Sequence, residues 1–187
     1  MIQIRNNTFE TNSSSSHSLV ITKNAKEWLT PEECLDDLWI YFDTETGIYS
    51  PPDYLDDLFE FNRYPFKVLD SFKQKLMFLY ANVPSRYYGK DKDGYSKWRH
   101  DYYKISNVVK AFIPEYKRVK FDGDRPSCEA YNVLATIQQH MTLEEFLRNP
   151  NIIVICDGDE YNIWKDLKKI GLIDTRGIEK EIKFPGG

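Results

Sequence analysis

The N-terminal segment of the chain concentrates side chains of the kinds that bind phosphate or transfer protons. They belong to Arg5, Glu10, Ser13, Ser14, Ser15, Ser16 and His17. A guanidinium, a carboxylate, hydroxyls and an imidazole together can grip a phosphate or move a proton. Short runs of alternating apolar residues, 2–5 and 18–22, flank this segment. The sequence therefore predicts a strand–loop–strand unit over residues 1–22.

This inventory fits the cleavage of RNA without a metal ion. That reaction needs a base for the 2′-hydroxyl, an acid for the leaving oxygen and a cation for the phosphorane oxygens. His17 and Glu10 are the candidates for base and acid, and Arg5 is the candidate for the cation. The hydroxyls of Ser13 to Ser15 would bond phosphate oxygens. An alternative is a covalent serine nucleophile with His17 as its base.

Two plainer interpretations of the same segment stay open. A run of serines is typical of a solvated linker, and the polar groups of an ordered loop often only satisfy one another. Phe9 lies inside the polar segment, and apolar residues resume at once with Leu19, Val20 and Ile21. Both observations favour a loop that is anchored to a core.

The run from Arg5 to Ser18, RNNTFETNSSSSHS, resembles the N-terminal signature shared by a group of small proteins from bacteriophages and mobile elements. Some members of that group are anti-CRISPR proteins against the type II RNA-guided effector nuclease, and at least one is associated with truncation of the guide RNA. The resemblance covers about the first 22 of the 187 residues. It implies an RNA-guided nuclease, its guide RNA, or both as partner, and the cytoplasm of a host bacterial cell as the compartment.

Composition predicts a single domain over residues 1–187, because this length is usual for one domain with a substantial core. Cys34, Cys128 and Cys156 are far apart and odd in number, so we expect buried reduced thiols and no disulfide framework. No apolar run has the length of a membrane span, and the N-terminus lacks the pattern of a signal peptide. We therefore expect a cytoplasmic protein without a membrane partner.

The net charge of −4 is distributed unevenly along the chain. Residues 1–65 carry a net charge of −8, residues 66–125 carry +7 and residues 126–187 carry −3. A basic middle segment between acidic flanks indicates a polyanionic partner for the middle, whereas the acidic first third suits a basic partner. The alternative is that these charges are simply spread over solvated helices.

Cations and aromatic rings alternate in the basic middle segment, 66–125. The candidate RNA-binding residues are Arg86, Tyr87, Tyr88, Lys90, Lys92, Tyr95, Lys97 and Arg99. Lysine and arginine neutralise phosphates while aromatic rings stack on bases, so this pattern is typical of single-stranded nucleic-acid binding.

An acidic turn follows the apolar run 152–156. Its carboxylates, Asp157, Asp159 and Glu160, are weak candidates for a metal site, because Mg²⁺ prefers oxygen ligands. The favoured interpretation is a turn that leads into the N-terminus of a helix, so the sequence predicts neither a metal ion nor a cofactor.

Several periodic segments would position these groups. Helices are predicted over residues 24–39 with Thr30 as a cap, 66–81, 96–112, 130–139, 143–147 and 162–170, together with a short acidic helix after Asp53. Strands are predicted at 116–121, at 152–156 and at 178–184. The mixture predicts an α+β fold in which a small sheet of terminal strands packs against central amphipathic helices.

Overall fold

The described residues form an α+β fold in the computed structural model, which describes residues 17–23, 26–38, 42–43, 48–49, 66–82, 97–116, 118–119, 133–157, 163–172 and 175–184. This fold class confirms the prediction from sequence. No helix among these residues has the length and apolar character required to cross a membrane.

The larger sheet has four strands in the order β4-β6-β1-β7. Its strands are β1 (His17–Thr22), β4 (Phe66–Leu69), β6 (Ile152–Asp157) and β7 (Ile178–Lys183). All neighbouring strands are antiparallel, with Leu19 opposite both Val154 of β6 and Ile182 of β7. A smaller sheet has the order β2-β3-β5 and consists of β2 (Phe42–Asp43), β3 (Ile48–Tyr49) and β5 (Arg118–Val119).

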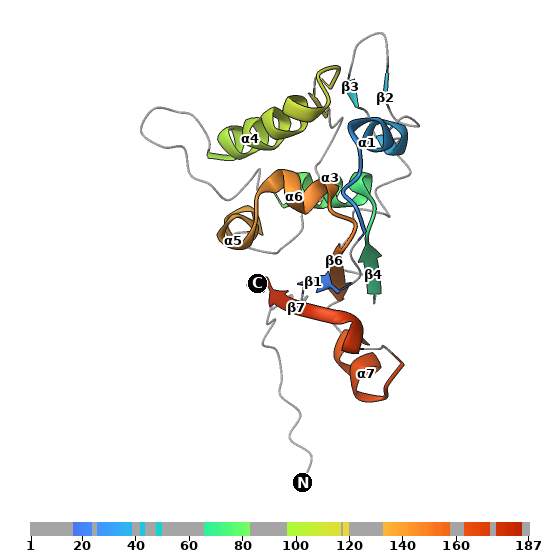
Figure 1. Cartoon of the computed structure of the whole chain (residues 1–187). Coiled ribbons are helices and arrows are strands. Elements are labelled where there is room, and N and C mark those ends of the chain that lie inside the picture. Colours follow the sequence, from blue (N-terminus) through green and yellow to red (C-terminus); the bar gives the residue numbers. More distant parts are fainter. Residues whose placement is uncertain are drawn as a thin grey trace, which may run out of the picture.

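Most of the described helices lie on one side of the larger sheet, and α7 lies on the other (Figure 1). The helices are α1 (Pro31–Leu38), α3 (Phe72–Ala81), α4 (Lys97–Phe112), α5 (Val133–His140), α6 (Leu143–Arg148) and α7 (Ile163–Lys169), with a 3-10 turn at Thr175–Gly177. Helix α4 is the layer farthest from the sheet, with α3 and α6 in between (Figure 1).

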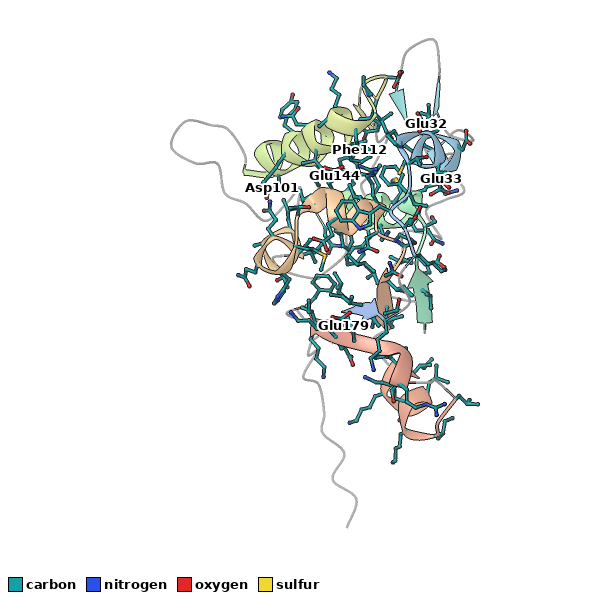
Figure 2. The ribbon with its side chains drawn as sticks, viewed as in Figure 1. Glu32, Glu33, Asp101, Phe112, Glu144 and Glu179 are labelled. Atoms are coloured by element: carbon teal, nitrogen blue, oxygen red, sulfur yellow. The ribbon has the colours of Figure 1, made fainter. Side chains whose placement is uncertain are left out.

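Three capping residues explain where helices begin. Thr30 accepts from the backbone N–H of Glu33, whose carboxylate accepts in return from the N–H of Thr30. Ser71 and Gln74 form the same reciprocal capping box at α3, and Thr142 caps α6. Such caps satisfy backbone donors that lack a partner in the first turn. Glu32 and Glu33 occupy the first turn of α1, close to the positive end of its dipole (Figure 2).

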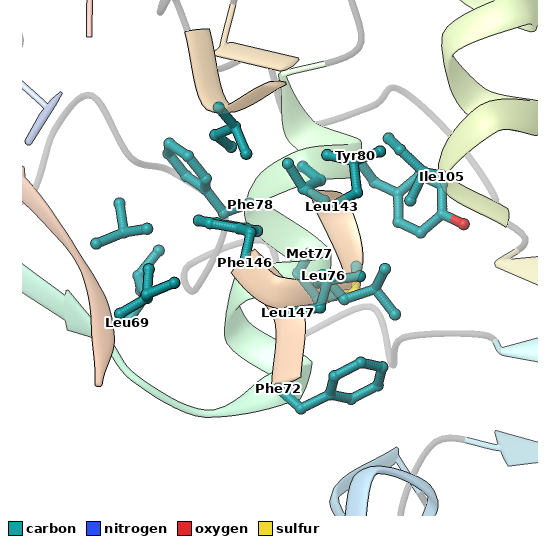
Figure 3. Packing of buried hydrophobic residues seen from close by; sticks show 14 of the residues in the cluster. Leu69, Phe72, Leu76, Met77, Phe78, Tyr80, Ile105, Leu143, Phe146 and Leu147 are labelled. Carbon is teal, nitrogen blue, oxygen red and sulfur yellow. The ribbon is translucent and has the colours of Figure 1, made fainter. Parts of the chain in front are cut away.

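The main core fills the space between the helices and the sheet. Its residues include Phe72, Leu76, Phe146 and Leu147, all with 0% exposure (Figure 3). Alternation along the strands divides the sheet into two faces. Leu19 belongs to the main core, while residues of the opposite face form a second cluster of Val20, Ile155 and Trp164.

A chain of buried hydroxyls joins the outer helix to the core. The hydroxyl of Tyr80 on α3 lies 2.9 Å from that of Ser106 on α4 and 2.8 Å from that of Tyr116. Tyr80 and Tyr116 are almost completely buried, so these bonds satisfy polar groups that water does not reach.

Two helix predictions began too early. Residues 26–30 are not helical, and α1 begins at Pro31 because Thr30 supplies the cap. Residues 66–69 form strand β4, paired with β6, and the helix begins only at Phe72. The spacing of Phe66 and Leu69 suited a helix, but the cap at Ser71 sets the boundary.

The second strand of the predicted strand–loop–strand unit, 18–22, is confirmed as β1. Both edges of β1 are occupied, by β6 and β7, so β1 has no edge left for pairing with residues 2–5. Those residues lie outside the described part of the chain, as does the helix predicted after Asp53. The predicted helices near 96–112, 130–139, 143–147 and 162–170 and the predicted strands near 116–121, 152–156 and 178–184 are confirmed, with shifted ends.

Candidate functional site at the end of the N-terminal signature

The described chain begins at the last two residues of the signature, His17 and Ser18. His17 opens β1, where its backbone is in register with Cys156 of β6. The other proposed catalytic residues, Arg5, Glu10, Ser13, Ser14 and Ser15, lie outside the described residues. Their convergence with His17 stays a prediction, but the signature ends in the middle of the larger sheet.

Ser18 belongs to a polar cluster on the face of the sheet that carries α7. We call Ser18, Trp164, Lys168 and Glu181 the anchor cluster. Ser18 is 4% exposed, and its side chain is hydrogen-bonded to the Glu181 carboxylate. Trp164 Nε1 donates to Glu181 Oε1 over 3.0 Å, and Lys168 Nζ donates to Oε2 over 2.7 Å. The cluster therefore ties the signature strand, α7 and β7 together.

The electrostatics of Glu181 limit what this cluster does chemically. Burial acts to raise the pKa of the Glu181 carboxyl, but hydrogen bonds from Lys168, Trp164 and Ser18 and the charge of Lys168 outweigh it and hold the pKa below its ordinary value. Lys168 Nζ also lies 4.9 Å from the centre of the Trp164 ring. A carboxylate held by three donors is a weak base, so the cluster does not activate Ser18 as a nucleophile. Its hydrogen bonds support β1, the strand that contains the last two residues of the signature.

The predicted RNA-binding residues reach the described chain only at the start of α4. Arg86, Tyr87, Tyr88, Lys90, Lys92 and Tyr95 lie outside the described residues, whereas Lys97 and Arg99 belong to the first turn of α4. The side chains of Ile105 and Val109 on α4 face the core and are 0% exposed. Its opposite side carries Tyr103, 61% exposed, and exposed Lys110. An aromatic ring and a cation thus lie on the solvent side of α4.

The acidic turn after β6 is described only at its start. Asp157 ends β6, with its backbone opposite Phe66 of β4, and Asp159 and Glu160 lie outside the described residues. Within the described part of the chain, no group of three or more His, Cys, Asp or Glu residues is placed to hold a metal ion.

A buried lysine was missed by the analysis of the sequence. Lys75 on α3 is 0% exposed, and its Nζ donates to the carbonyl oxygens of Asn149 at 2.9 Å and Ile152 at 3.4 Å. Its Nζ lies 6.0 Å from the centre of the Phe146 ring. Helical spacing carried the signal, because Lys75 lies three residues after Phe72 and one before Leu76 on the apolar face.

Burial changes the acid–base behaviour of Lys75 and of nearby Cys34. Burial lowers the pKa of the Lys75 amine to about 8, although the surrounding negative charges oppose this shift. Burial also raises the pKa of the Cys34 thiol to about 12, against the opposing charges of Arg148 and Lys75. Cys34 is therefore an unreactive thiol. Cys34 and Cys156 are buried thiols outside any disulfide, as the sequence predicted, and Cys128 lies outside the described residues.

Two polar residues fasten the segment that leads from β1 to α1. The Asn151 side chain accepts from the N–H of Lys26 and donates to its carbonyl oxygen, at 3.1 and 2.8 Å. Arg148 Nε donates to the carbonyl of Leu29 at 2.8 Å, and its guanidinium carbon lies 5.9 Å from the centre of the Trp28 ring and 5.3 Å from that of Phe112. The chain after the signature strand is thus fixed to the end of α6.

Comparison with known proteins found no matching family model, no matching curated protein and no matching solved structure. A function for this chain therefore has to be argued from the signature and from the chemistry of the chain's own residues.

Proposed function

We propose that the protein is an anti-CRISPR-like inhibitor of a type II RNA-guided nuclease. It acts either by blocking the loading of guide or target, or by promoting cleavage of the guide RNA. The observation that carries this proposal is the signature from Arg5 to Ser18 and its resemblance to the N-termini of such inhibitors.

Two features of the described chain support the proposal. The anchor cluster and the two neighbouring strands hold the last residue of the signature in a rigid sheet, which suits a loop that must present side chains in a fixed arrangement. Tyr103 and Lys110, on the outer side of α4, place an aromatic ring and a cation of the basic middle segment in solvent, which suits contact with the guide RNA.

The alternative function is that of a stand-alone metal-independent ribonuclease or another phosphate-processing enzyme. The residue types of the N-terminal loop favour it, because Arg5, Glu10 and His17 supply a cation, an acid and a base. This alternative predicts cleavage of RNA without the nuclease.

One experiment separates these functions. The protein is incubated with guide RNA, with and without the nuclease, in the presence of EDTA, and the RNA is resolved on a denaturing gel; target DNA cleavage is measured in parallel with Mg²⁺ present. Loss of DNA cleavage with intact RNA indicates steric inhibition, and RNA shortened only with the nuclease present indicates guide cleavage. RNA shortened by the protein alone indicates the ribonuclease. Intact RNA together with undiminished DNA cleavage would reject both functions.

The histidine of the signature has a matched control in the same chain. If His17 is the base, His17→Ala should reduce RNA cleavage by roughly 10²–10⁴-fold, because proton transfer belongs to the transition state. His140 is exposed on α5, outside the signature, so His140→Ala should leave cleavage unchanged. Equal cleavage by the two variants, with equal melting temperatures, would remove His17 from the mechanism.

The salt dependence of RNA binding tests whether the basic middle segment, 66–125, contacts the RNA. Replacing Lys90, Lys92, Lys97 and Arg99 by glutamine should weaken RNA binding and reduce the slope of log K against log salt by about 0.7 for each phosphate that is no longer neutralised. A control variant removes the same charge from α7 and β7 through glutamine at Lys165, Lys169, Lys180 and Lys183. Equal slopes for the two variants would place the RNA contact elsewhere.

A further inference from the structure

The C-terminal end of α7 presents two aliphatic side chains to solvent. Ile170 is 65% exposed and Leu172 is 72% exposed. Gly171 between them has φ of 73°, and hydrogen bonds join Leu172 N to Leu167 O at 3.1 Å and Gly171 N to Lys168 O at 3.2 Å. This pattern is a Schellman motif, in which glycine accepts the left-handed conformation. The exposed pair is therefore held on a hydrogen-bonded turn.

Positive charge surrounds this apolar turn. Lys165 and Lys169 are exposed on α7, and the half-buried Lys168 between them forms a salt bridge with Glu181. The described residues from 163 to 184 include six Lys or Arg and three Asp or Glu, a net charge of +3 among these described residues. We call Lys165, Lys169, Ile170 and Leu172 the tail patch. Paired exposed aliphatic residues next to cations indicate a contact surface for an anionic partner.

A surface of opposite charge lies on α1 and the segment before it. Glu27, Glu32 and Asp36 are exposed, and Trp28 is 44% exposed. Residues 26–38 contain one Lys and five Asp or Glu, and α1 has no basic residue in its last turn. We call Glu27, Trp28, Glu32 and Asp36 the head patch.

The two patches lie at opposite ends of the molecule. Helix α1 is on the far side of the helical layers from the larger sheet, and α7 is at the other extreme, beyond the sheet (Figure 1). Glu32 marks the head end among the drawn side chains (Figure 2). One molecule therefore cannot bring its own head and tail patches together.

We propose that the tail patch of one molecule binds the head patch of a second copy of the chain. Lysines would face carboxylates, and Ile170 and Leu172 would pack on Trp28. Because the two surfaces differ, the contact is heterologous, and it repeats head to tail as chains grow. Each patch is small, so the association is weak and depends on protein concentration. The inference is independent of the proposed function.

Sedimentation velocity over a range of concentrations tests this contact. In about 0.1 M salt the wild type should show a mass that rises with concentration, and in about 1 M salt this rise should shrink because charges are screened over about 3 Å. Lys165→Glu/Lys169→Glu should weaken association about tenfold or more, because it places like charges together. Leu172→Asp should do the same.

Matched controls use residues of α4 that belong to neither patch: Tyr103 and Lys110 are exposed, and Lys104 is half-buried and donates to Gln138 Oε1 over 2.7 Å. Lys104→Glu/Lys110→Glu makes the same change in total charge, and Tyr103→Asp makes the same kind of apolar-to-acid change, so neither should weaken association. Far-UV circular dichroism verifies that every variant is folded.

A charge-swap mixture gives the sharpest test. Glu27→Lys/Glu32→Lys, the head variant, should associate weakly alone, like the tail variant Lys165→Glu/Lys169→Glu. Mixing the two restores complementary pairs and should restore association. A wild type that stays monomeric at all concentrations in low salt would overturn the proposal. So would a tail variant that associates like its control, or a mixture no stronger than its components.

Discussion

The buried amine of Lys75 should make the stability of the protein depend on pH in the alkaline range. Burial lowers the pKa of this amine from 10.5 to about 8 in the folded chain. Between these values the unfolded chain keeps the proton that the folded chain has released. The free energy of unfolding attributable to Lys75 therefore rises as pH increases through 8 and levels off near 10.5.

The size of this effect follows from the shift. One pKa unit corresponds to about 1.4 kcal/mol, so the full contribution is about 3 kcal/mol, of which about 1 kcal/mol appears between pH 8 and 9. Above pH 9 Cys34 acts in the opposite direction. Its pKa is raised from 9.0 to about 12, so only the unfolded thiol ionises there and stability falls with pH. The two contributions nearly cancel from pH 9 to 10.5.

Two variants separate these contributions. Lys75→Met should lack the rise between pH 8 and 9, and Cys34→Ala should extend the rise toward pH 10.5. The assay is urea unfolding followed by tryptophan fluorescence at half-unit pH steps from 7 to 10.5, with a reductant present. The informative quantity is the difference from wild type, because other titrating groups cancel in it. Unfolding free energies of wild type and Lys75→Met that stay parallel from pH 7 to 9 would refute the reasoning.

Three further outcomes are expected. Glu181→Gln should lower the free energy of unfolding by about 1 kcal/mol at pH 7. Because the pKa of the Glu181 carboxyl is lowered in the folded chain, this difference from wild type should vanish as the pH falls through that pKa. Urea unfolding at a series of acid pH values measures it, and a difference that stays constant with pH would contradict the prediction. Tyr116→Phe should lower the free energy of unfolding by about 1 kcal/mol, measured by thermal unfolding. Tyr80→Phe should lower it more, because this change breaks the hydrogen bonds to both Ser106 and Tyr116. Equal losses for the two variants would argue against a central role of the Tyr80 hydroxyl among these three groups. Asn151→Ala should lower the free energy of unfolding by about 2 kcal/mol and speed hydrogen exchange at the Lys26 amide, because the Asn151 side chain bonds the backbone of Lys26. Unchanged exchange at Lys26 would show that the Asn151 side chain does not hold the segment between β1 and α1.

Local signals predicted much of the fold. Thr30 is a capping residue that the sequence identifies, and the apolar run 152–156 forms a sheet strand as expected. The boundary errors arose where a short apolar run fits both the helical and the strand spacing of apolar residues. The run FKVL at 66–69 suits a helix or a strand, and only its pairing with β6, more than 80 residues away, decides between them. Propensity yields to such tertiary contacts.

The sequence likewise identified some residues of the candidate site and not others. Residue types alone nominate Arg5, Glu10 and His17, because cations, acids and bases are visible in a sequence. The anchor cluster was invisible there, because Ser18 and Glu181 meet only through strand pairing. Lys75 was missed because a charged residue on an apolar helix face is usually assigned to solvent.

The position of β1 in the larger sheet has a consequence for synthesis of the chain. Both neighbours of β1 come from beyond residue 150, so its ladders join residues separated by more than 130 positions. Contacts of such high order are slow to form, because the intervening loop must close first. On the ribosome, residues 17–22 have to wait for β6 and β7 to emerge. The signature thus acquires its full support only after residue 183 has emerged, and nascent chains released before residue 178 would leave one edge of this apolar strand open to aggregation and proteolysis.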